Sequence, residues 1–276
     1  LQDLNQLDAA VKSYQMTLAL QNNYFKAHNN LGVIYKEFGQ MGDAVKSFEQ
    51  AIGFQPDYAE AHNNLGTTLQ ELGQLNEAVN CYEKALDIQP DYIEVHNNLG
   101  NTFNLLGQTD EALNSYKQTL SINPDYADAH NNIGIIYHEM GKLNEAIKCY
   151  EKAIAINPEN AEAHNNLGVT LNKLTQFHKA VKFYEQALSI NPNYDEAYFN
   201  LGVTLDKMGQ SDEALNSYKQ ALVINPDYAD AYNNIGNIRQ QLGQFDDAFN
   251  SYIHALAIDH DNADFHRNLA LMKNYK

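Results

Sequence analysis

One pentapeptide recurs along the chain at a constant spacing of 34 residues. It reads His-Asn-Asn-Leu-Gly in four copies, and four looser variants keep the same spacing. A fixed period of this length indicates a solenoid, in which each unit is one supersecondary motif that packs on its neighbours. The eight copies start at His28, His62, His96, His130, His164, Tyr198, Tyr232 and His266.

The period divides the chain into units of equal length. With Phe25 as position 1, partial repeats occupy 1–24 and 263–276, and we expect one domain over 1–276. Because both ends fall inside a repeat, we expect the chain to be a piece of a longer array. The seven full repeats are 25–58, 59–92, 93–126, 127–160, 161–194, 195–228 and 229–262.

Glycine and proline fall into columns that divide each repeat into two helices. All six prolines occupy position 32, and thirteen of the fifteen glycines occupy position 8 or position 15. Glycine at position 15 is suited to the left-handed residue that ends a first helix, helix A, and proline at position 32 cannot continue a second, helix B. Glycine at position 8 lies inside helix A, where it predicts close approach of another helix.

Acidic and small residues predict where the helices begin and which face they bury. An aspartate at position 33, followed by an acid at position 2, predicts a carboxylate capping box for helix A, and asparagine or aspartate at position 18 predicts the start of helix B. Alanine at position 20, an aromatic residue at 24 and alanine or threonine at 27 lie on one helical stripe, which we expect to be buried.

These columns resemble the tetratricopeptide repeat, which has Leu-Gly at positions 7 and 8, alanine at 20 and 27, an aromatic residue at 24 and proline at 32. The resemblance covers the whole chain. One departure is histidine or tyrosine at position 4, where the family often has tryptophan. The resemblance implies an all-α fold, a right-handed superhelical solenoid of antiparallel helix pairs.

Composition limits the partners and the environment. A formal net charge of −17 disfavours nucleic acids and anionic membranes, which bind clustered lysine and arginine. Part of this charge is accounted for by acids at helix N-termini, whatever the function. No apolar run is long enough to insert in a membrane.

Cys81 and Cys149 both lie at position 23, two repeats apart, so we expect free thiols and a cytoplasmic protein.

The sequence contains no recognisable catalytic motif, so we expect no enzymatic activity, no cofactor and no metal. Five histidines at position 4 are each one repeat apart, too far to share a metal ion with bonds of about 2 Å. Since position 4 shares the apolar face with positions 7 and 11, we interpret these histidines as packing residues.

The opposite face of helix A, formed by positions 2, 5, 6, 9, 12 and 13, is predicted to be exposed, and asparagine recurs on it. Asparagine is a poor residue for a helix interior, but its amide can both donate to and accept from an extended backbone. Position 6 holds Asn30, Asn64, Asn98, Asn132, Asn166, Asn200, Asn234 and Asn268. Position 5 adds Asn63, Asn97, Asn131 and Asn165 to the predicted peptide-binding set, with Asn29 and Asn233 at the same position.

This asparagine row is similar to that in the tetratricopeptide arm of O-linked N-acetylglucosamine transferases, in which the resemblance implies a groove for peptide backbone. We therefore expect a non-catalytic scaffold that binds a protein or peptide in an extended conformation. Two alternatives remain: the substrate-recruiting arm of a larger glycosyltransferase or sulfotransferase, and a spacer or self-assembly element. Alternatively, asparagine at position 6 is simply frequent in this repeat family and has no role in binding.

Two irregular regions carry further expectations. Repeat 161–194 has Thr175 in place of the glycine at position 15, and Phe199 replaces asparagine at position 5 of the next repeat. One explanation is drift in a tolerant position, and the other is a local bend with Phe199 as an apolar anchor for the peptide in the groove. The chain is expected to start with a helix B over 8–21 and to end with a helix A over 263–276, which predicts weak head-to-tail self-association.

Overall fold

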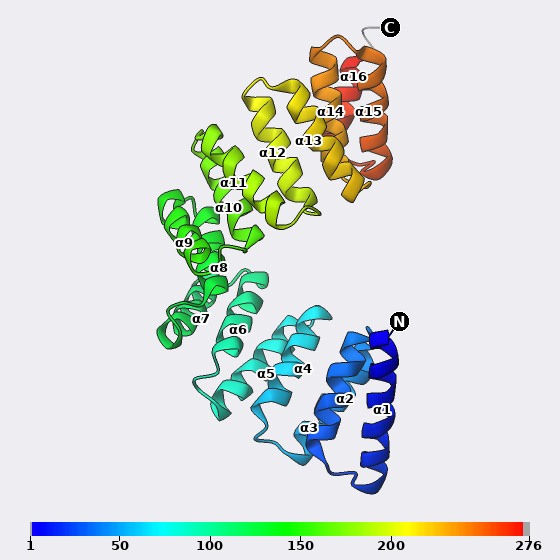
Figure 1. Cartoon of the computed structure of the whole chain (residues 1–276), viewed down its shortest axis with the longest axis vertical. Coiled ribbons are helices and arrows are strands. Elements are labelled where there is room, and N and C mark those ends of the chain that lie inside the picture. The colour runs from blue at the N-terminus through cyan, green and yellow to red at the C-terminus, as the bar shows by residue number, and fades with distance from the viewer. Residues whose placement is uncertain (1, 273–276) are drawn as a thin grey trace. The chain divides into compact units, whose positions relative to one another are not determined.

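The computed structural model describes residues 2–272 and shows, within them, sixteen α-helices and no strand (Figure 1). Seven helices occupy the helix A positions: α2 (Phe25–Glu37), α4 (Ala59–Glu71), α6 (Ile93–Leu105), α8 (Ala127–Glu139), α10 (Ala161–Lys173), α12 (Asp195–Lys207) and α14 (Ala229–Gln241). Seven occupy the helix B positions: α3 (Met41–Phe54), α5 (Leu75–Ile88), α7 (Thr109–Ile122), α9 (Leu143–Ile156), α11 (Phe177–Ile190), α13 (Ser211–Ile224) and α15 (Phe245–Ile258). The outermost helices are α1 (Gln2–Leu20) and α16 (Ala263–Met272).

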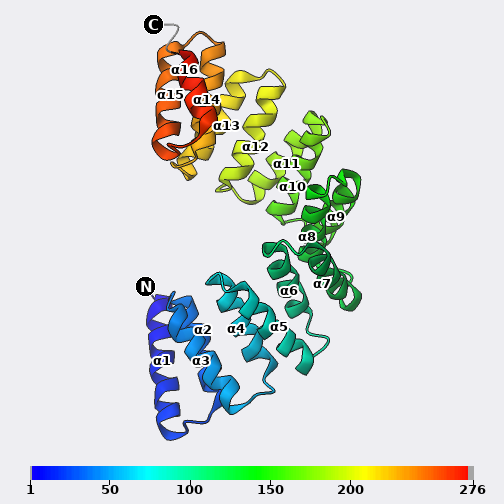
Figure 2. The ribbon, with the colours of Figure 1, turned by 180° about the vertical axis from the view of Figure 1, so that it is seen from behind.

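The chain forms two compact units, 1–132 and 133–276, and the division falls inside α8. In each unit, helix A and helix B of one repeat form an antiparallel hairpin, and the next hairpin follows beside it (Figures 1 and 2). The predicted all-α solenoid of helix pairs is therefore confirmed for each unit.

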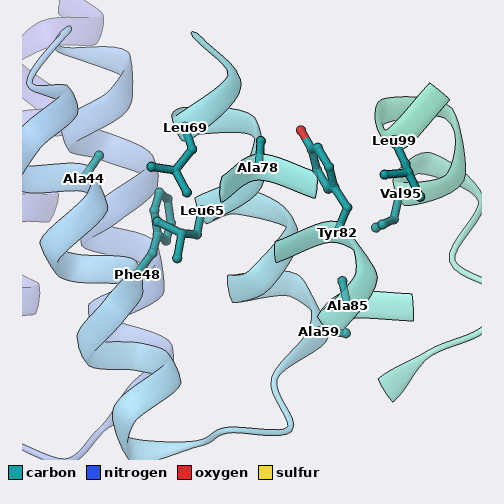
Figure 3. Close-up of a cluster of buried hydrophobic side chains, with 10 residues drawn as sticks. All are labelled: Ala44, Phe48, Ala59, Leu65, Leu69, Ala78, Tyr82, Ala85, Val95 and Leu99. Carbon is teal, nitrogen blue, oxygen red and sulfur yellow. The ribbon is translucent and has the colours of Figure 1, made fainter. Parts of the chain in front are cut away.

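The predicted core stripe of helix B is buried in both units. In unit 1, Ala78, Tyr82 and Ala85 of α5 have no exposed surface, and they pack with Leu65 of α4 and Leu99 of α6 (Figure 3). In unit 2, Ala180, Tyr184 and Ala187 of α11 repeat the arrangement. Burying each aromatic side chain contributes about 1.5–3 kcal/mol, which makes this stripe the main source of stability in a repeat.

The glycine at position 8 lies against the aromatic ring at position 24 of the same repeat. A Cβ atom added to Gly32 would lie 2.5 Å from Cε1 of Phe48, and one added to Gly66 would lie 2.7 Å from Cε1 of Tyr82. Because these rings are fully buried, they cannot move aside. The predicted close approach is confirmed, and the neighbouring helix is helix B of the same repeat.

Position 15 ends helix A in the left-handed conformation, as predicted. Its glycines have φ between 71° and 76°, and Thr175 adopts φ 59° at the same place. A β-branched residue is strained in this region of φ and ψ. Repeat 161–194 therefore has the same turn as the other repeats, but with backbone strain at Thr175.

Neither predicted helix start is confirmed: the N-cap of helix A lies one residue after the predicted aspartate, and helix B begins one residue before the predicted position 18. Helix A begins after an N-cap at position 34, and helix B begins after an N-cap at position 16. Tyr58 and Gln74 at these positions make no side-chain cap, whereas Asn160 at position 34 accepts the N–H of Ala163 at 2.9 Å. The aspartate at position 33 lies one residue too early, because the turn needs an extra residue in an extended conformation. Asparagine at position 31 shapes that turn in later repeats, where Asn123 Oδ1 accepts the N–H of Asp125 at 3.1 Å.

The N-terminal prediction also needs correction. Helix α1 runs unbroken from Gln2 to Leu20, whereas the sequence indicated a helix B over 8–21. Asn5 occupies position 15 here, where later repeats have glycine, and it stays within the helix. The predicted helix over 263–276 is present to Met272, and residues 273–276 lie outside the described range.

The glycine–aromatic contact predicts opposite effects for two alanine substitutions in unit 1. Gly32→Ala should lower the free energy of unfolding by about 1–3 kcal/mol, because the methyl group would overlap the Phe48 ring. Gly53→Ala in α3 should raise it by about 0.5 kcal/mol, since no atom lies within 4 Å of the added carbon and alanine favours the helix. Urea unfolding followed by circular dichroism measures both, and equal effects would contradict the contact.

Candidate functional site

The asparagines at positions 5 and 6 of helix A differ in exposure. The prediction that position 5 is exposed is wrong: Asn29 and Asn165 have no exposed surface, and Asn63, Asn97, Asn131 and Asn233 are 2–9 % exposed. A helical wheel treats helix A as isolated, whereas position 5 is covered by the next repeat. The eight position-6 asparagines are half-buried and remain at the surface.

Side-chain hydrogen bonds join the two positions across successive repeats. In unit 1, Nδ2 of Asn64 donates to Oδ1 of Asn29 at 3.0 Å, and Nδ2 of Asn98 donates to Oδ1 of Asn63 at 3.2 Å. Unit 2 repeats the bond from Asn200 to Asn165 at 3.1 Å and from Asn268 to Asn233 at 2.9 Å. We call each such bond an asparagine rung. The rungs fix the position-6 amides and satisfy the buried carbonyls at position 5.

Three position-6 asparagines have other partners. Asn30 donates to the Tyr14 hydroxyl at 3.0 Å, and Asn234 donates to the Tyr218 hydroxyl at 3.4 Å. Asn132 donates to Oδ1 of Asn101 at 2.9 Å instead of to Asn97. Oδ1 of Asn97 is consequently buried without a partner among the described residues.

Carboxylates and tyrosines line one edge of the asparagine row. Seven acids occupy position 2 from Glu60 to Asp264, and all seven are exposed. Glu60 accepts from Nδ2 of Asn29 at 3.1 Å and from the Tyr58 hydroxyl at 2.7 Å. Burial, the bond to Glu60 and its charge raise the pKa of Tyr58. In unit 2, burial and nearby carboxylates, Glu196 first among them, raise the pKa of Tyr228 to about 12. The edge is therefore electronegative in both units.

The same edge is negative at the end of unit 1. Burial raises the pKa of Tyr126, and the charges of Asp128 and then Glu94 raise it further. Both carboxylates are exposed, whereas Tyr126 is half-buried.

Phe199 lies in a packed aromatic group. Its ring stacks on Tyr228, with centroids 4.7 Å apart and planes 24° apart, and its centroid lies 5.7 Å from that of Tyr218. Phe199 is half-buried against the core of unit 2. The ring therefore fills the space left by the asparagine that it replaces.

The position-4 histidines have a role that the sequence analysis missed. Nε2 of His62 lies 2.9 Å from the carbonyl oxygen of Pro56, and His96, His130 and His164 make the same contact with the proline six residues earlier. Each histidine thereby ties the inter-repeat turn to helix A. Their constant spacing from proline was the available signal. No group of side chains suited to a metal ion occurs among the described residues.

Two pockets and two cysteines lie outside the asparagine row. A pocket of 640 Å³ beside His62 in unit 1 is lined by Ile52, Pro56, Lys84 and Ile88, and a pocket of 340 Å³ beside His164 occupies the same repeat positions in unit 2. Both cysteines are free, and burial raises the pKa of the Cys81 thiol to about 11, so it is a poor nucleophile. Within 2–272, no helix has the length and apolar character to cross a membrane.

Family comparisons match the chain along almost its whole length. Models described as TPR repeat match 1–39, 136–175, 207–243 and 236–273, and models described as tetratricopeptide repeat match 26–91, 57–125, 115–148, 161–194 and 183–216. The chain belongs to the tetratricopeptide repeat family. Such repeats form scaffolds typical of protein–protein interaction. Among curated proteins, none matches this tetratricopeptide chain.

Solved structures share the tetratricopeptide fold. A chain of the APC/C hetero-tetramer Cut9–Hcn1 is 15 % identical with a TM-score of 0.76, covering 96 % of this chain and 52 % of its own length. This chain therefore spans about half of that relative. MamA is 28 % identical with a TM-score of 0.52, covering 60 % of this chain and 97 % of its own. YrrB, titled a TPR protein with an unusual peptide-binding site, is 21 % identical with a TM-score of 0.52, covering 68 % and 96 %.

The asparagine rungs predict energetic coupling between neighbouring tetratricopeptide repeats. Asn98→Ala should lower the free energy of unfolding by about 1–3 kcal/mol, because it leaves the buried Asn63 carbonyl unsatisfied. A double-mutant cycle with Asn63→Ala should give a coupling energy of about 0.5–1.5 kcal/mol by urea unfolding. Additive effects of the two substitutions would show that the rung contributes nothing.

Proposed function

We propose that the helix A face of each unit binds a polypeptide in an extended conformation and that the chain acts as a non-catalytic scaffold. The observation that carries this proposal is a row of surface amides that are already held in place. In unit 1 the row is Asn30, Asn64, Asn98 and Asn132, and in unit 2 it is Asn166, Asn200, Asn234 and Asn268.

The rungs leave hydrogen-bonding capacity for a ligand. A primary amide has two N–H donors and an acceptor oxygen, and a rung uses one donor. At Asn64 and Asn98, the second N–H and Oδ1 have no partner among the described residues, while the half-buried side chains remain reachable. One donor and one acceptor per repeat match the alternating C=O and N–H groups of an extended backbone.

The spacing of the row also suits an extended chain. Adjacent packed helices lie about 8–10 Å apart. An extended strand advances about 3.3 Å per residue, so about three residues of ligand would cover each repeat. Because the amides are held by their rungs, binding would cost little side-chain entropy.

Several further observations support the proposal. The tetratricopeptide family is used mainly for protein interaction, and the row resembles that of O-linked N-acetylglucosamine transferase arms. The net charge of −17 disfavours nucleic acids and anionic membranes as partners. In this proposal, the buried position-5 asparagines that accept a rung orient the row, and Phe199 packs beneath it.

The test begins with 12-residue peptides selected from a random display library on the full chain. Among these peptides, we use one that binds at unit 1. Replacing Asn64, Asn98 and Asn132 by alanine should weaken its binding by about two orders of magnitude, since each contact contributes about 0.5–1.5 kcal/mol. Fluorescence anisotropy measures the affinity, and circular dichroism confirms that the variant remains folded at the assay temperature.

Two controls make the test specific. Alanine at Asn76, Asn80 and Asn114, which are exposed on α5 and α7, removes the same chemical group from helix B and should leave affinity unchanged. N-methylation of the peptide backbone removes its N–H donors without touching the protein, and it should weaken binding as well. Unchanged affinity in the helix A variant, or an equal loss in the helix B variant, would contradict the proposal.

A further inference from the structure

Two lysines on helix A of unit 2 carry positive charge that the chain does not neutralise. Lys173 of α10 and Lys207 of α12 both occupy position 13, one repeat apart, and both are exposed. Neither forms an ion pair with any residue that the structure describes. Repeat 161–194 has three lysines and two glutamates, and it is the one full repeat with a positive net charge in a chain of net charge −17.

The same two helix positions are neutralised in unit 1. There, Nζ of Lys36 at position 12 of α2 lies 2.8 Å from Oε1 of Glu71 at position 13 of α4. In unit 2, Nζ of Lys207 at position 13 of α12 donates to Oδ1 of Asn172 at position 12 of α10, also at 2.8 Å. A neutral amide oxygen accepts one of the three ammonium N–H groups and leaves the charge uncompensated. This bond therefore holds Lys207 beside α10 while its charge remains available.

Both lysines lie on the same face of helix A as the amide row. Lys173 follows Asn166 by seven residues, and Lys207 follows Asn200 by seven. Seven residues correspond to a rotation of only about 20° and a rise of about 10.5 Å along the helix. The acid at position 2, such as Glu162, precedes the position-6 asparagine by about 6 Å on the same face. In unit 2, the amides thus lie between acids on one side and lysines on the other.

The other titratable groups near the two lysines leave this side positive. Glu139 occupies position 13 of α8 and is exposed, one repeat before Lys173. Burial, and then the charge of Lys173, lowers the pKa of His138, so this ring is neutral at pH 7. Asp206 is half-buried, and after burial its charge is the next cause that raises the pKa of Tyr218 on α13. On α10 and α12, the exposed charges at position 13 are therefore both positive.

We propose that Lys173 and Lys207, which we call the lysine edge, bind acidic side chains of a polypeptide held along the amide row of unit 2. The inference rests on the proposed function, because the amides hold the backbone. Successive side chains of an extended chain point to opposite sides, so alternate residues on the row would face the lysine edge. The long side chains of lysine and glutamate can together bridge the rise between the row and the edge. The lysine edge thus selects ligands with an acidic residue on that side.

The test uses a neutral 12-residue peptide, selected on the full chain, that the unit 1 peptide does not displace. Each of its positions in turn carries glutamate, glutamine or lysine, and fluorescence anisotropy measures the affinity. At one or more positions, glutamate should bind about two- to fivefold more tightly than glutamine, as expected for an exposed ion pair, and added salt should reduce the difference. Lys173→Gln combined with Lys207→Gln should remove this preference and leave the glutamine peptide's affinity unchanged. Glutamate at both places should transfer the preference to the lysine peptide.

Two controls isolate the lysine edge. Lys182→Gln combined with Lys219→Gln removes the same charge from exposed sites on α11 and α13, helix B of the same two repeats, and should retain the glutamate preference. The unit 1 peptide should show no glutamate preference, because position 13 of unit 1 holds Glu37, Glu71 and Leu105.

A purely structural role for the two lysines predicts a different result. Both lie in the last turn of their helices, where a cation stabilises the helix dipole. If this is their only role, the double glutamine variant melts at a lower temperature, measured by circular dichroism, and retains any glutamate preference. That result would overturn the lysine edge.

The lysine edge would also be wrong if glutamate and glutamine peptides bound equally at every position. An equal loss of preference in the helix B control would overturn it too, because the attraction would then come from the overall charge. These results leave the proposed function standing when alanine at Asn166, Asn200 and Asn234 weakens binding of the same peptide. If that alanine variant binds as tightly as the parent protein, the proposed function fails and the lysine edge fails with it.

Discussion

The contact between the glycine at position 8 and the aromatic ring at position 24 governs the geometry of each repeat. A Cβ atom added at Gly66 would lie 2.7 Å from Cε1 of Tyr82, which is too close for any side chain. The backbone of helix A therefore packs directly against the aromatic ring of helix B. This close approach brings the opposite face of helix A to the surface at the same orientation in every repeat. A row of identical side chains can form only because this orientation is repeated. The buried helix B stripe and the exposed asparagine face are thus two consequences of one packing contact.

In the proposed function, the asparagine rungs connect stability to recognition. In a repeat protein, stability is approximately a sum of terms within repeats and between neighbours. The rung from Asn98 to Asn63 is a term between neighbours, and it uses half of the donor capacity of a surface amide. The second N–H and Oδ1 of Asn98 have no partner among the described residues, and the side chain is half-buried. Asparagine is a poor helix former, but in this proposal it serves both stability and recognition, whereas alanine would serve neither.

The sequence predicted well what depends on contacts within one repeat. The core stripe at Tyr82, the glycine contact and the left-handed turns follow from local patterns of residue size and backbone freedom. What it could not predict depends on the neighbouring repeat. Burial of Asn29, the rung that satisfies it and the redirected amide of Asn132 arise from how one helix A packs beside the next. The histidine contact at His62 and the N-cap at Tyr58 depend on the shape of the inter-repeat turn, which the aspartate pattern misplaced by one residue.

If the asparagine row binds peptides, one amide proton of each rung asparagine is held inside the protein while the other is available to a ligand. Nuclear magnetic resonance of the side-chain amides in the full chain tests it directly, by following hydrogen exchange at Nδ2 of Asn64 and Asn98 before and after adding a peptide selected on unit 1. We predict that one proton of each pair exchanges slowly from the start and that the second becomes protected when the peptide binds. If both protons exchange freely in the unbound protein, or if the second is unaffected by a bound peptide, the claim is wrong.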